Sequence, residues 1–161
     1  MNNFVFILLG SNLGDRSTNL EIARQEISRL IGASITTSSI FKTAAWGNPN
    51  QPDFYNQVIK LNTVLPPEEV LINTRAIENE MGRIRQEKWE PRIIDIDILF
   101  YGNRIVNQPE LIIPHPQIPN RRFTLLPLHE IASDFIHPSL QKSITQLLEE
   151  CTDSLEVERI Q

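Results

Sequence analysis

The chain is poor in cysteine and in long apolar runs, and each shortage excludes a class of protein. Cys151 is the one cysteine among 161 residues, so an intramolecular disulfide and a cysteine-based zinc site are excluded. No apolar run approaches the ~20 residues that span a bilayer. The first residues lack the basic segment and the small-residue cleavage site of a signal peptide. We therefore expect one domain over residues 1–161, located in the cytoplasm and not in a membrane.

Positive charge is also scarce, since 15 Lys and Arg face 20 Asp and Glu and the net charge is −5. General affinity for nucleic acid normally requires a basic face, so we expect no nucleic-acid partner. The positive residues nonetheless cluster in two places. The first cluster contains Arg75, Arg83, Arg85, Lys88 and Arg92, and the second is the adjacent pair Arg121 and Arg122. Local basic clusters on an acidic protein suit a small polyanion.

The strongest chemical signal is a pair of carboxylates, Asp95 and Asp97, within the strand-like apolar run 93–99. Successive side chains of a strand point to opposite faces, so these two acids share one face and Ile94, Ile96 and Ile98 share the other. Like charges side by side on an apolar strand repel each other and lose hydration. A bound Mg²⁺ would offset that cost. The alternative is an edge strand with two solvated acids.

Four basic residues, Arg83, Arg85, Lys88 and Arg92, flank the carboxylate pair. Guanidinium groups clamp phosphate oxygens with two parallel hydrogen bonds. A metal between two carboxylates can bridge nucleotide phosphates and neutralise the charge that develops on transfer. The combination indicates a nucleotide–metal site. The alternative for the basic residues is a solvated helix end and loop.

Several aromatic residues lie in or beside expected loops, namely Trp46, Phe54, Tyr55, Trp89 and Phe123. Flat rings together with the polar groups of Asn56 and Thr43 suit a planar heterocycle, although loop anchoring explains each ring equally well. His115 lies between two prolines and close to Arg121. It is either a phosphate contact or a structural histidine.

Hydrophobic periodicity predicts strands at 4–9, 34–43, 54–62 and 93–101. A tight turn is expected at Gly10–Gly14 between the first strand and a helix that begins with a capping box at Thr18 and ends with Gly32 as its C′ residue. A second helix begins at Pro66–Pro67 and ends at Gly82. The resulting order β-α-β-β-α-β predicts an α+β protein with a ferredoxin-like, mainly antiparallel sheet.

The last third of the chain is expected to add helices and one strand to that core. The proline-rich connection 107–122 is predicted to be without regular structure. Helices are expected at 123–132 and 143–151, and an added strand at 155–160.

Taken together, these motifs resemble the 6-hydroxymethyl-7,8-dihydropterin pyrophosphokinases of folate biosynthesis. The family signature Trp-x-Pro-Arg-x-x-Asp-(aliphatic)-Asp-(aliphatic) is matched over residues 89–98. Further matches are Gly10–Leu13, Gln51–Phe54 with Asn56, Glu78 to Arg83, and Pro114–His115 to Phe123. The resemblance extends from about residue 4 to about residue 150. Departures include Ala44–Ala45 in place of two prolines and Phe54 in place of tyrosine.

The resemblance implies a diphosphotransferase that moves pyrophosphate from MgATP to the pterin hydroxymethyl group and releases AMP. Asp95 and Asp97 would bind two Mg²⁺ ions, and Arg83, Arg92 and Asp97 would be catalytic. Residues implied to contact the pterin are Thr43, Ala44, Trp46, Phe54, Asn56, Trp89 and Phe123. Residues implied to contact ATP are Glu78, Arg85, Lys88, Trp89, Ile98, His115 and Arg121. The expected partners are these two small substrates, and the expected state is a monomer.

Two rival interpretations stay open on the residues alone. A two-metal nucleotidyl transferase or cyclase would also use paired aspartates, but it would bind nucleotide without pterin. A non-catalytic regulatory module of ferredoxin-like fold would need neither the acid pair nor the arginine-rich loop.

Overall fold

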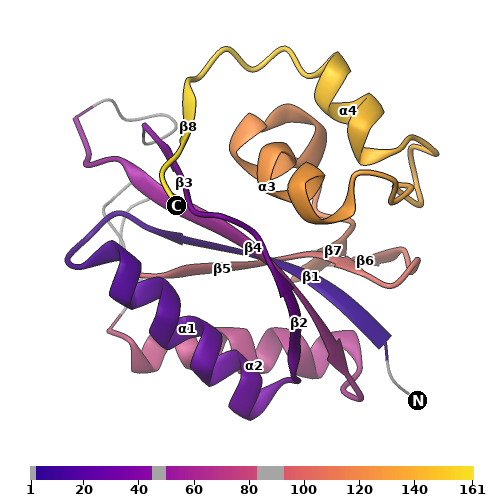
Figure 1. Cartoon of the computed structure of the whole chain (residues 1–161). Coiled ribbons are helices and arrows are strands. Elements are labelled where there is room, and N and C mark those ends of the chain that lie inside the picture. Colours follow the sequence, from indigo (N-terminus) through magenta and orange to yellow (C-terminus); the bar gives the residue numbers. More distant parts are fainter. Residues whose placement is uncertain (1–2, 45–49, 83–92) are drawn as a thin grey trace.

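A computed structural model of the chain describes residues 3–44, 50–82 and 93–161, which fold into helices on both faces of one main sheet (Figure 1). Along the chain the elements are β1 (Asn3–Ser11), α1 (Arg16–Leu30), β2 (Ser34–Thr37), β3 (Phe41–Thr43), β4 (Phe54–Thr63), α2 (Pro67–Glu80), β5 (Asp95–Tyr101), β6 (Val106–Gln108), β7 (Leu111–Ile113), the 3-10 helix η1 (Ile118–Asn120), α3 (Arg122–Ala132), α4 (Ile144–Glu150) and β8 (Val157–Arg159).

The main sheet has six strands in the order β5-β1-β4-β3-β8, with β2 also paired to β4. The pairs β1–β4, β1–β5, β2–β4, β3–β4 and β3–β8 are all antiparallel. The two helical crossovers, α1 and α2, each return the chain to a strand two places away in the sheet, with one strand between. The predicted β-α-β-β-α-β arrangement and the α+β, mainly antiparallel class are therefore confirmed.

Each face of the sheet is covered by a pair of helices, α1 and α2 on one face and α3 and α4 on the other (Figure 1). The α1/α2 face is mainly aliphatic, with Val5, Ile7, Leu9, Ile27 and Ile77 in its core. The α3/α4 face contains Phe6, Leu8, Phe100, Leu125 and Leu147. Strand β1 is buried on both faces, which explains its uninterrupted apolar sequence.

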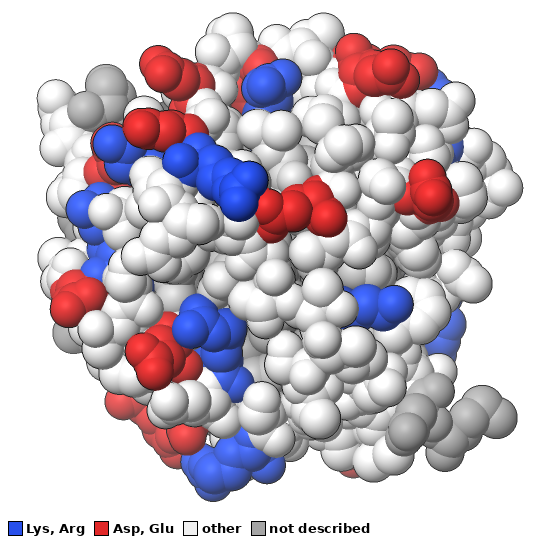
Figure 2. Space-filling model, in the orientation of Figure 1, with Lys and Arg blue, Asp and Glu red and all other residues white. Residues whose placement is uncertain are grey.

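Charged side chains of both signs are interspersed on the face shown in Figure 2, where Lys and Arg lie beside Asp and Glu. Surface ion pairs of the described residues include Lys142–Glu150 at 2.6 Å and Arg29–Glu26 at 2.7 Å. Within the described residues, no helix is long and apolar enough to cross a membrane.

The predicted strand 34–43 is wrong as one element, because it is divided into β2 and β3 at Ser38–Ile40. Side-chain hydrogen bonds replace part of the ladder at the division. The Ser38 hydroxyl accepts from the Val58 amide at 2.9 Å, and the Gln57 amide donates to the Ser38 carbonyl at 2.8 Å.

The connection 107–122 is not without structure, contrary to the prediction. It contains most of the β6–β7 hairpin, in which Val106 pairs with Ile113, and the 3-10 helix η1. Val106, Leu111 and Ile113 are buried in the core of the α1/α2 face. Packing of these apolar side chains stabilises strands that are too short to be recognised from periodicity.

At the two ends of α1, the predicted capping box at Thr18 is wrong, whereas Gly32 is confirmed as the C′ residue that follows the C-cap Ile31. The N-cap of α1 is Asp15, whose carboxylate accepts from the Thr18 amide at 3.1 Å, so Thr18 lies inside the helix. Gly32 does not adopt a left-handed conformation, since a Cβ there would lie 1.8 Å from the Asn62 carbonyl oxygen. Close packing on β4 therefore explains this glycine.

The turn predicted at Gly10 lies further along the chain. Gly10 belongs to β1, and the positive φ of the turn, +73°, is found at Gly14. The expected end of α2 is confirmed, because Gly82 follows the helix with φ +87°. Helices α3 and α4 and strand β8 also lie where they were expected.

Candidate active site

The two aspartates lie on β5 as the alternation predicts. Asp95 and Asp97 are half-buried on the α3/α4 face, while Ile94, Ile96 and Ile98 are buried on the other. Asp95 is opposite Gly10 in β1, and Asp97 is opposite Leu8. Ile96, which lies between them, is bonded to α2, because the Glu78 carboxylate accepts a hydrogen bond from the Ile96 amide at 2.8 Å. This bond fixes the backbone that carries both acids.

A bulge in β5 connects the aspartates to the loop of His115. The pairing with β1 shifts between Phe6 and Ile7, so that Ile98 and Phe100 have partners in β1 and Leu99 does not. The Leu99 carbonyl instead accepts from the His115 amide at 3.0 Å. Bulges commonly re-aim neighbouring groups near functional sites. Here the bulge frees the Leu99 carbonyl of β5 to bind the loop that contains His115, so this loop lies beside the strand of Asp95 and Asp97.

A basic side chain faces the acid pair. Arg121 is the N-cap residue of α3, and the charges of Asp97 and Asp95 both act on its guanidinium. Burial lowers the pKa of Arg121 from its ordinary value, and the nearby acids, including Asp153, oppose that shift. An arginine remains protonated in proteins, so the site holds a partly buried positive charge beside two carboxylates.

His115 is kept neutral at this site. Burial first and then the positive charge of Arg121 lower its pKa, against the opposing charge of Asp95, and the net pKa is about 4. Its Nδ1 atom accepts from the Gln117 amide at 3.1 Å, which places the ring proton on Nε2. A neutral histidine with a protonated Nε2 can donate one hydrogen bond to an anionic ligand without adding charge.

Gly10 of β1 lies between Asp95 on β5 and two groups on β4, the Asn56 amide and the Phe54 ring. It pairs with Asp95 on one side and with Asn56 on the other. A Cβ at Gly10 would lie 3.1 Å from the Asn56 Oδ1 atom and 3.5 Å from the Phe54 ring. The absence of a side chain therefore leaves room for both groups on the sheet surface.

The buried side-chain amide of Asn56 is suited to bind a ligand. Its side chain is 3 % exposed, and its Nδ2 atom has no hydrogen-bond partner among the described residues. A buried donor without a partner costs about 1–3 kcal/mol, so such groups usually have a function. A heterocycle with a ring nitrogen or carbonyl oxygen would provide the acceptor.

The other expected pterin residues surround this amide. Thr43 is opposite Phe54 at the end of β3, and its hydroxyl donates to the Glu156 carbonyl at 3.1 Å. Ala44 follows and is exposed. Phe123 is half-buried in the first turn of α3, with the Arg121 guanidinium 5.5 Å from its ring centroid. The described ring, amide and hydroxyl groups thus lie on β3, β4 and the start of α3.

Some predicted residues are not brought into this group. The Ile98 side chain is buried on the α1/α2 face, so a contact with ATP would have to use its backbone. Glu78 is 5 % exposed and bonded to β5, which indicates a positioning role. The predictions for Trp46, Arg83, Arg85, Lys88, Trp89 and Arg92 concern residues outside the described part of the chain.

Three residues near the site were not recognised from the sequence as part of it. The Arg16 guanidinium donates to the Asp53 carbonyl at 2.8 Å and lies 4.0 Å from the Tyr55 ring centroid. The Asn12 amide donates to the Gln51 side chain at 3.0 Å. These contacts hold the segment that precedes Phe54. Asn12 and Gln51 belong to the Gly10–Leu13 and Gln51–Phe54 motifs and could have been found from them. Arg16 lies outside every motif, so no sequence pattern indicated it.

The donor set fits a metal that arrives with a nucleotide. No group of three or more His, Cys, Asp and Glu side chains that could hold a metal occurs in the described residues. Mg²⁺ usually takes one or two protein carboxylates and completes its shell with water and substrate phosphates. Two carboxylates opposite an arginine, beside an unsatisfied amide and aromatic rings, are typical of a phosphoryl-transfer enzyme for a flat substrate.

Comparison with known proteins identifies the family within that class. The family profile of the 7,8-dihydro-6-hydroxymethylpterin-pyrophosphokinases matches residues 6–133, so the chain belongs to this family. It is 43% identical over 149 residues to the 2-amino-4-hydroxy-6-hydroxymethyldihydropteridine pyrophosphokinase of Haemophilus influenzae, covering 92% of each chain. It is 44% identical over 147 residues to the enzyme of that name from Synechocystis, covering 89% of this chain and 75% of that one.

Solved structures agree on the fold. The chain matches the wild-type Plasmodium falciparum HPPK-DHPS protein with a TM-score of 0.76 at 17% identity, covering 93% of this chain. The match spans 42% of that longer chain, so the likeness concerns one part of it and supports the fold alone.

Proposed function

We propose that this chain transfers the pyrophosphoryl group of ATP to the hydroxymethyl group of 6-hydroxymethyl-7,8-dihydropterin in folate biosynthesis. Family membership and identities above 40% to enzymes with this name support the reaction. The single structural observation that carries the proposal is the row Asn56–Gly10–Asp95, which crosses three adjacent strands. It puts a buried amide whose Nδ2 atom has no partner among the described residues and a member of the acid pair on opposite sides of a glycine, which suits a flat ring joined to a phosphate acceptor.

Asp95 and Asp97 would hold Mg²⁺, two ions by resemblance to the family. When bound, the metal neutralises charge on the triphosphate and polarises its phosphorus–oxygen bonds. The carboxylates share one strand face at adjacent alternate positions, so both would hold metal at the same place on the sheet. Asp97 would also accept the proton of the pterin hydroxyl.

The chain's other residues would bind and orient the substrates. Phe54 and Phe123 would stack on the pterin, and Asn56 would bond its polar edge, with Thr43 and Ala44 alongside. Arg121 and neutral His115 would bind phosphate oxygens, and the Ile98 backbone and Glu78 would support the nucleotide. Trp46, Arg85, Lys88 and Trp89 are proposed contacts, and Arg83 and Arg92 the catalytic pair, by resemblance.

The pterin hydroxyl oxygen would form a new bond to the β-phosphorus of ATP while the bond from that phosphorus to the α–β bridging oxygen breaks. AMP leaves with that oxygen, and the β- and γ-phosphates stay together on the product. Catalysis then depends mainly on positioning and on charge stabilisation by groups already in place. We further propose a cytoplasmic monomer, since the described part of the site is built within one chain.

The test is incubation with MgATP and 6-hydroxymethyl-7,8-dihydropterin, followed by chromatography of the nucleotides. AMP should form in equal amount with pterin diphosphate and only when both substrates are present. ADP as the product would indicate an ordinary kinase. Free pyrophosphate formed without pterin would favour the nucleotidyl transferase or cyclase, and binding without turnover would favour the regulatory module.

A further inference from the structure

The segment that follows α4 contacts two elements that carry proposed pterin residues, the end of β3 and the start of α3. In Figure 1 it leaves α4, passes over the molecule and ends as β8 beside β3. The family profile ends at residue 133, before this segment begins. We define residues 153–160 as the C-terminal strap.

The first part of the strap holds the start of α3. The Asp153 carboxylate accepts from the Arg122 amide at 3.1 Å and from the Leu155 amide at 3.0 Å. Helix α3 has no capping side chain of its own, because Arg121 at the N-cap position makes no such bond. Asp153 therefore supplies both the acceptor and the negative charge that a helix N-terminus favours. Arg121 and Phe123 lie in the turn that it holds.

The second part of the strap holds the end of β3. Phe41 pairs with Arg159, and Thr43 pairs with Val157. The Thr43 hydroxyl donates to the Glu156 carbonyl at 3.1 Å, and the Ile160 amide donates to the Ile40 carbonyl at 2.9 Å. Strand β3 has three residues, and it would be an edge strand without β8. Short edge strands open at low free energy, so β8 should order the end that carries Thr43.

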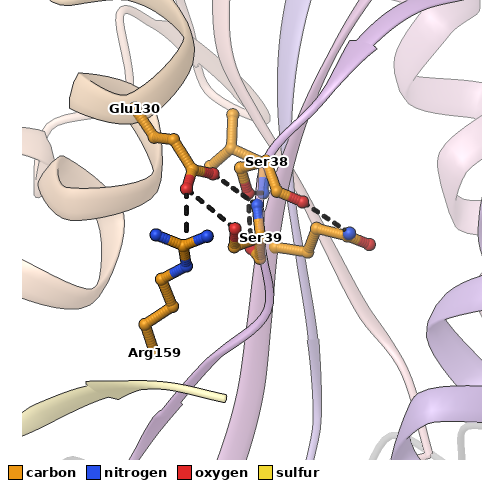
Figure 3. Close-up of polar contacts among 6 residues, drawn as sticks. Ser38, Ser39, Glu130 and Arg159 are labelled. Atoms are coloured by element: carbon orange, nitrogen blue, oxygen red, sulfur yellow. Dashed lines mark hydrogen bonds and ion pairs between the residues drawn. The ribbon is translucent and has the colours of Figure 1, made fainter. Parts of the chain in front are cut away.

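A third contact links α3, β3 and β8 directly. Figure 3 shows the Glu130 carboxylate of α3 between Ser39 and Arg159. It accepts from the Ser39 amide and, at 2.7 Å, from the Ser39 hydroxyl, and it lies 3.9 Å from the Arg159 guanidinium. The break between β2 and β3, the helix and the strap are thus joined by one carboxylate.

We propose that the C-terminal strap is a positioning element for the pterin half of the site. It fixes the end of β3 and the start of α3 relative to each other, and so sets the separation between Thr43 and Phe54 on one side and Phe123 on the other. The inference rests on the proposed function. Of the substrate contacts that the strap holds, Thr43 and Phe123 are proposed for pterin and Arg121 for ATP. The described pairing of β8 is with β3, which carries Thr43, so loss of β8 should affect pterin more than ATP.

The experiment compares Glu158→Pro with Glu158→Ala in the full chain. Both remove the exposed pair with Lys42 at 3.5 Å, but only proline removes the backbone N–H at the centre of β8. We expect Glu158→Pro to raise the Kd for pterin, measured with a non-reactive ATP analogue, by about tenfold through misplacement of its contacts. The KM for ATP should stay within about twofold, and Glu158→Ala should resemble wild type. Amide exchange at residues 40–44 should accelerate in the proline variant alone.

Each outcome decides a different point. If wild type makes no AMP, the proposed function fails. If wild type is active and Glu158→Pro binds pterin as tightly as Glu158→Ala, the strap proposal fails and the function stands. Equal losses for pterin and ATP would indicate general damage and would also overturn it. If Glu158→Pro does not fold, Asp153→Ala against Asp153→Asn repeats the test, because asparagine keeps an acceptor for the Arg122 amide.

Discussion

The two ends of the sheet face under α3 and α4 carry very different side chains, although β1 and β5 contribute to both. At one end Phe4, Phe6, Phe100 and Phe135 form a cluster with ring centroids 4.7 to 5.9 Å apart. At the other end β1, β4 and β5 carry Gly10, Asn56, Asp95 and Asp97. The bulge at Leu99 lies between the two ends on β5.

The difference shows how one face can serve stability and binding in separate places. The aromatic end buries its rings against one another, so it should carry much of the folding free energy of this face. The polar end combines paired acids with a buried amide whose Nδ2 atom has no partner in the described part of the chain, which is unfavourable until a ligand binds. Substitutions at the two ends should therefore separate turnover from stability.

The largest effect is expected at the polar end. Asp95→Ala or Asp97→Ala should lower kcat on the order of 100- to 1,000-fold, because each removes a proposed metal ligand. The melting temperature should change little, since relief of the repulsion between the two acids offsets the lost attraction to Arg121. Steady-state AMP release and thermal unfolding measure both quantities, with the exposed Asp134→Ala as the matched control. Near-normal turnover of either variant would remove that residue from the metal site.

At the aromatic end, Phe100→Ala should have the opposite profile. Phe100 is fully buried and contacts three other rings, so its removal should lower the free energy of unfolding by about 3–5 kcal/mol. The kcat per folded molecule should be unchanged. Urea denaturation and active-site titration test this prediction. A loss of kcat in fully folded protein would mean that the two ends are coupled.

Phe123 tests the ring that closes the polar end. Phe123→Ala should weaken pterin binding by about 1–3 kcal/mol, by analogy with stacking of bases on aromatic side chains. Titration with pterin and a non-reactive ATP analogue gives this value. Phe135→Ala is the control, because it removes a ring from the aromatic end and should change stability and not pterin affinity. Equal pterin affinity in wild type and Phe123→Ala would exclude Phe123 from the pocket.

The smallest effect concerns pH. His137 lies beside Phe100 with ring centroids 5.5 Å apart, and its Nδ1 atom accepts from the Ser139 and Leu140 amides at 3.2 and 3.0 Å. Burial lowers its pKa in the folded protein below the ordinary value of 6.5. The unfolded chain therefore takes up the proton first, and this contribution to stability is present above about pH 6.5 and decreases as the pH falls.

His137→Gln should flatten this part of the stability curve. The comparison is urea unfolding of wild type and variant between pH 7.5 and about pH 5, where their difference should shrink as the pH falls. A constant difference over that range would mean that His137 does not titrate on unfolding. The pH dependence of pterin affinity should be the same in both proteins.

Local patterns along the chain were sufficient for most of the fold. Alternation placed Asp95 and Asp97 on one face of β5, and apolar periodicity with proline and glycine boundaries placed α2 between Pro67 and Glu80. These predictions succeed because period and capping are properties of neighbouring residues. The order β-α-β-β-α-β then restricted the topology to a ferredoxin-like sheet.

Errors arose where a distant partner decided the local structure. Gly32 does follow α1 as predicted, but close packing on β4 is what requires a glycine there, and the β6–β7 hairpin depends on burial under other elements. Arg16 and Asp153 act through the backbone of Asp53 and Arg122, which are 37 and 31 residues away in the chain. No local pattern reports such contacts.

The sequence by itself determined the class of fold, the acid pair and, through its motifs, the family. Those features depend on residue type and on spacing along the chain. Only the tertiary structure decided that Gly10 lies between Asn56 and Asp95, that the Leu99 carbonyl at the bulge binds the His115 amide, and that residues 153–160 contact both β3 and the start of α3. Strand register and long-range hydrogen bonds produce these arrangements, and both form only when segments far apart in the chain pack together.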